Sequence, residues 1–127
     1  MAMSKIDPVA KGFVGRWRIV HMPDFDQAAK DVDVPAYIEF LENGRGSFQF
    51  VVVCGEIRAK FSEKKGRPHA SFEWLGSDEG DEVRGTGVAF VNGKERMGGY
   101  CFMDDGDDYA FVAERDTAVK SKKAPRR

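Results

Sequence analysis

About eight segments of this chain alternate between apolar and polar side chains with a period of two. Such alternation is typical of β-strands that bury one face. The segments lie near residues 15–22, 36–42, 46–53, 56–62, 69–75, 83–91, 95–103 and 108–114. Most stretches between them are short and carry turn residues, as in "ENGR" at 42–45 and "VNGK" at 91–94. We therefore expect successive strands to be antiparallel hairpin neighbours.

One connection, residues 23–35, is longer and differs in pattern. It contains the one convincing helical turn of the sequence, with Asp24 or Asp26 as candidate N-cap residues and Pro35 as its stop. We therefore expect a single short helix after the first strand.

The meander of strands can end in two ways. It can form an open sheet with two unpaired edges, or a barrel in which the last strand pairs with the first. One small helix cannot cover the apolar face of so large an open sheet. The sequence therefore predicts an all-β fold, an up-and-down antiparallel barrel of about eight strands with one short helix after the first strand.

The size of the chain fits a single domain. It has 127 residues, of which 42% are apolar and ten are phenylalanine, enough for one substantial core. We expect the barrel domain to span residues 1–118. Residues 119–127, "VKSKKAPRR", form a basic tail that lacks the apolar residues needed to order it.

The faces of the predicted strands differ along the chain. The early strands have one apolar and one polar face, as in a barrel with a wet outside. From residue 83 onward, Val88, Phe90, Tyr100 and Phe102 fall on the face opposite Ala89, Met97, Met103 and Phe111. The outer surface there is apolar, so a homodimer partner, the N-terminal segment or a packed loop is expected to cover it.

Charge sorts between the two ends of the meander. The loops at 23–35, 76–82 and 104–108 fall at one end and are strongly acidic, with Lys30 as their single base. The opposite end, which includes 63–68 and the tail, is basic. The net charge of −1 therefore conceals a separation of negative and positive charge between the two ends. The acidic rim either keeps the protein in solution or repels anions and concentrates cations.

The apolar segments and the cysteines of the sequence both indicate a cytoplasmic protein. No apolar run approaches the roughly 20 residues that cross a bilayer, and the N-terminal residues have no signal-peptide core. Cys54 and Cys101 are too few for a disulfide framework and lie among apolar neighbours. We expect a cytoplasmic protein with both thiols reduced, a disulfide between them being the lesser alternative, and no membrane partner.

Trp17, in "FVGRWRIV", and Arg115, in "FVAERD", are expected to meet where the last strand closes on the first. An arginine stacked on an indole would close that end of the barrel. Gly15-Arg16-Trp17 on the first strand, with an arginine closing the last, resembles the calycin superfamily of lipocalins, fatty-acid-binding proteins and avidins. The resemblance implies a barrel that holds a small ligand. The chain also resembles small bacterial proteins of uncharacterised function with a "GRW" start, a "PAYIEF" strand and a "GDDxxF" ending.

The mouth at the acidic end is the predicted binding site. Its inward residues form the candidate ligand-binding set, which is His21, Ile38, Val52, Trp74, Met103 and Tyr109. A few polar groups above an aromatic floor suit a small apolar or aromatic ligand. The many aromatic side chains could also fill the barrel completely, so a cavity and a solid core both stay open.

Three functions follow from this reading. The first is a non-catalytic barrel that binds a small ligand, with a homodimer formed through the late strands. The second is a small enzyme that uses His21 and Tyr109 at the mouth, and the third is a structural or protein-interaction module with a solid core. We assign no catalytic residues, because no serine or cysteine lies in a nucleophile-elbow context.

No cofactor or metal is predicted. A lone histidine such as His21 is more typical of a hydrogen-bonded rim residue than of a haem ligand. The acidic turns do not match the spacing of an EF-hand loop. The strands lack the basic, aromatic face of oligonucleotide-binding barrels, so no specific nucleic-acid partner is expected.

Overall fold

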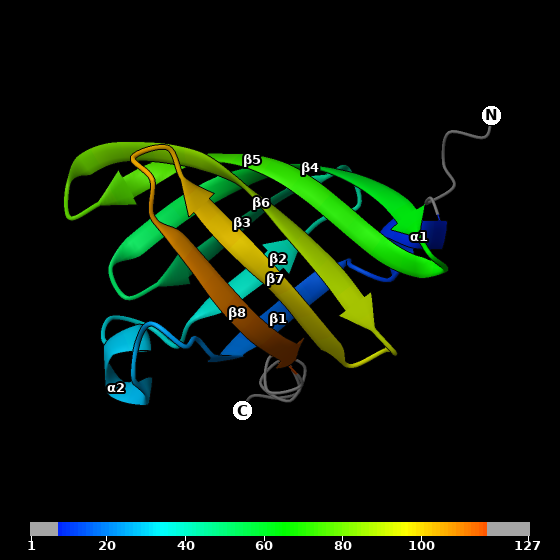
Figure 1. The fold of residues 1–127 in the computed structure, drawn as a ribbon, viewed down its shortest axis with the longest axis horizontal. Helices are drawn as coiled ribbons and strands as arrows, with labels where there is room; N and C mark the ends of the chain where they lie inside the picture. The colour runs from blue at the N-terminus through cyan, green and yellow to red at the C-terminus, as the bar shows by residue number, and fades with distance from the viewer. Residues whose placement is uncertain (1–7, 117–127) are drawn as a thin grey trace, which may run out of the picture.

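The computed structural model describes residues 8–116 and contains one closed antiparallel β-barrel (Figure 1). Its strands are β1 Gly15–His21, β2 Tyr37–Phe40, β3 Arg45–Phe50, β4 Val53–Lys64, β5 Arg67–Asp78, β6 Asp81–Asn92, β7 Arg96–Met103 and β8 Asp108–Arg115. Each strand pairs with the next along the chain, and β8 returns to pair with β1. The predicted all-β barrel is therefore confirmed. The tail predicted for 119–127 lies outside the described residues.

The helix after the first strand is also confirmed. It is α2, Gln27–Lys30, and Asp26 is its N-cap residue. The Asp26 carboxylate accepts a hydrogen bond of 2.8 Å from the backbone N–H of Ala29, which satisfies one of the free donors of the first turn.

A second short helix was not predicted. It is α1, Pro8–Lys11, and it lies at the end of the barrel opposite α2 (Figure 1). The chain then enters the barrel at Phe13, whose buried ring stacks on Phe61 at 5.2 Å and meets Phe40 edge-on at 5.5 Å. Residues 8–14 thus cap this end of the barrel.

Trp17 and Arg115 lie opposite each other on the β1–β8 seam. The guanidinium carbon of Arg115 lies 4.1 Å from the centre of the buried Trp17 ring. The guanidinium also donates to the backbone carbonyls of Val14, at 2.7 Å, and Gly12, at 3.0 Å, while the Trp17 indole donates to the carbonyl of Phe13. These bonds fix the segment before β1 to the last strand.

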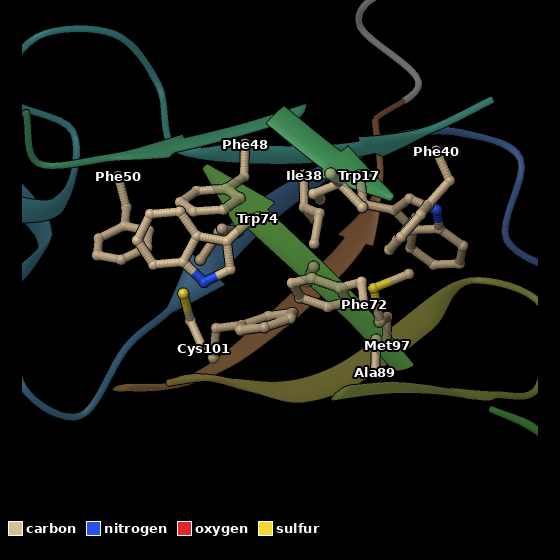
Figure 2. Close-up of a cluster of buried hydrophobic side chains, with 14 of the residues drawn as sticks. Trp17, Ile38, Phe40, Phe48, Phe50, Phe72, Trp74, Ala89, Met97 and Cys101 are labelled. Carbon is tan, nitrogen blue, oxygen red and sulfur yellow. The ribbon is translucent and has the colours of Figure 1, made fainter. Parts of the chain in front are cut away.

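Aromatic rings fill the barrel (Figure 2). Several of them face a glycine across the strand pair, and these pairs are Phe40 with Gly46, Phe48 with Gly55, Phe72 with Gly87, Trp74 with Gly85, and Phe111 with Gly99. At Gly55 the fit is close, since an added Cβ would lie 2.7 Å from the Phe48 ring and 2.9 Å from Trp74. At Gly55, Gly87 and Gly99 the facing ring occupies space that a side chain on the opposite strand would otherwise take.

The connections divide between two ends, as expected for a meander. Those at 22–36, 79–80 and 104–107 share one end, and those at 41–44, 65–66 and 93–95 share the other. Among the described residues the first end is rich in acids and the second carries Lys64, Lys65, Arg67 and Lys94. We call them the acidic end and the basic end.

The late strands are apolar outside as well as inside, as the two-sided pattern indicated. Tyr100 and Phe102 stack on the outer face of β7 with ring centres 6.0 Å apart. The homodimer predicted through this face stays a prediction.

Candidate functional site

The structure divides the six residues predicted to form the mouth. Ile38, Trp74 and Met103 are buried and belong to one continuous core. Tyr109 is half-buried and packs against that core. These four side chains are packing partners rather than the walls of an open mouth.

Two of the six do not point inward, which corrects the expected register. The register of β1 against β8 shifts between Ile19 and His21, and His21 is exposed. Val52 lies in a tight turn after β3, because the strand ends at Phe50 and the backbone of Val51 turns with a φ of 56°. The inward position expected for Val52 is taken by Val53.

Phe25 closes the acidic end. Its ring packs against Tyr109 at 5.2 Å and against Phe50 at 6.2 Å, and Met22 beside it is fully buried. The backbone N–H of Val51 donates to the carbonyl of Lys30, which holds the connection from β1 to β2 over the barrel. Sequence reasoning placed Phe25 in a polar loop and missed it as a plug.

The hydroxyl of Tyr109 is engaged at this closed end. It donates to the Asp107 carboxylate at 3.3 Å. Burial raises the pKa of Tyr109, and the carboxylates of Asp107, Asp105 and Asp24 raise it further. The phenol therefore keeps its proton at neutral pH.

Among the described residues, Lys30 is the charged residue whose side chain is fully buried. Its ammonium donates to the Asp31 carboxylate at 2.9 Å, and the same carboxylate accepts the N–H of Ala36 at 2.8 Å and lies 3.7 Å from Arg18. Burial alone would raise the pKa of Asp31, but the hydrogen bonds and the two cations outweigh it and lower the pKa. We assign this cluster a structural role, because the Lys30 ammonium has no exposure to a ligand.

A hollow of about 960 Å³ lies outside the barrel, across the outer faces of β2 to β6. We call it the outer groove. One cross-strand row of its wall consists of Glu39, Ser47, Glu56, Leu75 and Arg84. The next row, toward the basic end, consists of Leu41, Arg45, Arg58, Glu73 and Thr86. Trp74 is the one predicted mouth residue that also borders this groove.

Leucine occurs twice in the sequence, and both residues lie in the outer groove. Leu41 is 47% exposed and Leu75 is 49% exposed. Leucine is normally among the most buried residue types. The groove therefore offers apolar contact at two points within a wall that is otherwise polar.

The sequence contained a signal for this groove that we did not use. Leu75 directly follows the inward Trp74, so the strand alternation places it on the outer face. Leu41 is likewise out of phase with Ile38 and Phe40. Two apolar residues on the wrong face of a wet sheet indicated a surface contact, but the depth of the groove depends on how the long strands β4, β5 and β6 bend.

Comparison with family models, with curated proteins and with solved structures finds no match to this chain. Within residues 8–116, no group of three or more histidine, cysteine or acidic side chains is arranged to hold a metal ion. Neither helix that the structure describes is long and apolar enough to span a bilayer.

Proposed function

We propose that this protein is a non-catalytic binding barrel whose small ligand lies in the outer groove. The observation that carries the proposal is the exposure of both leucines within one hollow. The volume of about 960 Å³ falls in the range of small-molecule sites, roughly 300 to 1,000 Å³. This site differs from the mouth predicted from the sequence, but the ligand is still expected to contain an apolar or aromatic group.

The packed interior supports a site on the outside. Rings that face glycines occupy the barrel, and Phe25, Phe50 and Tyr109 close its acidic end. A ligand in the barrel would have to displace these side chains, whereas the groove is open.

The closing pair supports a relationship to calycin barrels. A buried tryptophan on the first strand, covered by an arginine from the last, is the feature on which that resemblance rests. We propose the relationship on this pair and on the order of the strands. In this chain the barrel would serve as a rigid scaffold for a site on its wall.

Replacement of Leu75 by glutamine tests the groove. We would screen a library of aromatic and aliphatic fragments against the ¹⁵N-labelled protein and map the amide shifts. Fragments are expected to shift groove residues, and Leu75→Gln should weaken them about tenfold through lost apolar contact. Val32→Gln removes an exposed apolar side chain that lies outside the groove and should leave binding unchanged.

The alternative function is an interaction module with a solid core, which the packed interior also suits. A screen in which no fragment shifts the groove would favour this alternative. Shifts confined to Phe50, Tyr109 and their neighbours would instead place the ligand at the mouth and overturn the groove.

A further inference from the structure

We propose that the outer groove recognises an oxyanion, a carboxylate or a phosphate, through Arg45 and Arg58. This inference rests on the proposed function and specifies the ligand class. The ligand would carry an apolar part against Leu41 and Leu75 and an anionic group at the two arginines.

The two arginines form an unusual cross-strand pair. Arg45 on β3 lies directly opposite Arg58 on β4, and both are exposed. Like charges in this position repel each other and destabilise a sheet. An anion between them would convert that repulsion into attraction on both sides.

Neither guanidinium is neutralised by the part of the chain that the structure describes. The ion pairs of the groove wall use other arginines, with Arg16 bound to Glu39 at 3.4 Å and Arg84 bound to Glu82 at 3.2 Å. The side chains of Arg45 and Arg58 make no ion pair and no hydrogen bond among these residues. Their donors are therefore available to a ligand.

Nearby carboxylates do not occupy the pair. Glu73 lies opposite Arg58 across β4 and β5 but forms no ion pair with it. A second hollow, of about 280 Å³, is lined by Arg45 and Arg58 and not by Glu73. The two arginines thus line both the outer groove and this smaller hollow.

Asn43 adds a third donor at the smaller hollow. Its side-chain oxygen accepts the backbone N–H of Arg45 at 2.9 Å, so its amide N–H₂ group faces away from that bond. Gly44 beside it adopts a φ of +87°, and a Cβ there would lie 2.8 Å from the carbonyl oxygen of Ala59. Glycine therefore allows the turn to approach β4, which brings Asn43 and Arg45 close to Arg58.

The hydrogen-bond donors of the two arginines and the positive potential around them both favour an anionic ligand. Guanidinium groups bind carboxylate and phosphate oxygens through paired hydrogen bonds. The site lies on the basic side of the groove, and Lys60 on the same face of β4 adds positive potential. Glu73, opposite Arg58 on β5, and Glu56, two residues before Arg58 on β4, also line the groove, where they would accept hydrogen bonds from hydroxyl or amino groups of the ligand.

The test compares three probes with one apolar body, phenyl phosphate, phenylacetate and benzyl alcohol, with inorganic phosphate as a fourth. Binding would be followed by ¹⁵N amide shifts and by the arginine side-chain N–H signals. We expect at least one aromatic anion to bind at the pair, tighter than benzyl alcohol, and Arg45→Gln or Arg58→Gln to weaken it about tenfold. The ratio of phenyl phosphate to phenylacetate affinity identifies the preferred oxyanion.

Arg67→Gln is the matched control, because Arg67 is exposed and lies outside both hollows. It should keep at least half of the wild-type affinity. An equal loss in all three variants would mean attraction by the basic end as a whole and would overturn the specific site. Binding of benzyl alcohol as tight as that of the anions, with no dependence on arginine, would overturn the oxyanion and leave the groove function standing.

The remaining outcomes are equally clear. Absence of any shift at the arginines with 10 mM of each anion, a concentration chosen on the order of weak fragment affinities, would overturn the oxyanion site. Melting curves of the glutamine variants would verify the fold, and removal of one charge from the repelling pair is expected to leave the melting temperature unchanged or raised.

Discussion

At the scale of single residues, the burial of the Lys30 ammonium is the feature with the largest desolvation cost. Its ammonium is fully enclosed and depends on the Asp31 carboxylate 2.9 Å away. Taking an ammonium out of water is costly, and removal of the carboxylate that pairs with it would leave the buried charge without a partner. The pair therefore makes the closed acidic end sensitive to a single change.

Asp31→Asn is expected to destabilise the protein by about 3 kcal/mol, because it leaves the Lys30 ammonium buried without a counter-charge. Urea unfolding at pH 7 measures the change. The double variant Lys30→Met, Asp31→Asn should recover much of the loss, while Asp24→Asn, an exposed change in the same loop, should have little effect. A double variant no more stable than the single one would contradict the role of the pair.

The Asp31 carboxylate also predicts the direction in which the free energy of unfolding changes with pH. The folded protein lowers the pKa of Asp31 below that of the unfolded chain, near 3.9. Its stabilisation is therefore fully present above about pH 4 and is lost as the pH falls through the lower folded pKa. Between pH 5 and about pH 2, the free energy of unfolding of Asp31→Asn should fall less than that of the wild type.

At the scale of elements, strands were easier to predict than the parts that cap them. The alternation in residues 83–91, with turn residues on both sides, led to β6, and the N-cap Asp26 led to α2. The helix α1 has four residues and no apolar periodicity, so nothing in its own sequence distinguishes it from a loop. Its place depends on long-range contacts with β4 and β5.

The candidate site was harder to predict than the strands for the same reason. The inward position of Trp74 followed from alternation, but the register shift on β1 that exposes His21 did not. Whether a barrel is hollow depends on the pairing of each ring with the residue across the strand. That pairing is fixed by register, and a slip of one residue would turn the ring outward.

Phe13 is the residue through which α1 and its following turn stabilise the barrel. Its ring is fully buried between Phe40 and Phe61, and its carbonyl accepts the Trp17 indole. Phe13→Ala is expected to cost about 3 to 5 kcal/mol through the cavity it leaves. Chemical unfolding of this variant beside Val14→Ala, a half-buried neighbour, measures it, and a cost below about 1 kcal/mol would show that the cap is dispensable.

At the scale of the whole molecule, closure and charge separation have different consequences. Closure joins β1 to β8 and leaves no strand edge in the barrel for another chain to extend. Charge separation leaves one end acidic and the other basic at a net charge of −1. The field of the molecule therefore has a direction, and the outer groove lies along it with its free arginines toward the positive end.

Because aromatic rings face glycines across the strands, the removal of a single ring could turn the filled interior into a cavity. Phe72 lies opposite Gly87, and Gly87 lies opposite Cys101 on β7. Burial raises the pKa of the Cys101 thiol to about 12, so it should resist alkylation at pH 8 in the folded protein. Phe72→Ala would leave an empty chamber, because its cross-strand neighbours are Gly87 on β6 and the small Ala59 on β4, and such apolar chambers accept benzene-sized guests.

In a Cys54→Ser background, alkylation of Cys101 by iodoacetamide would report the new chamber. We expect faster labelling in Phe72→Ala than in the parent, and slower labelling again when benzene is added. Equal rates in the two proteins would mean that the barrel collapses around the missing ring. The filled barrel thus contains the space for an internal cavity, which the removal of one aromatic ring would open.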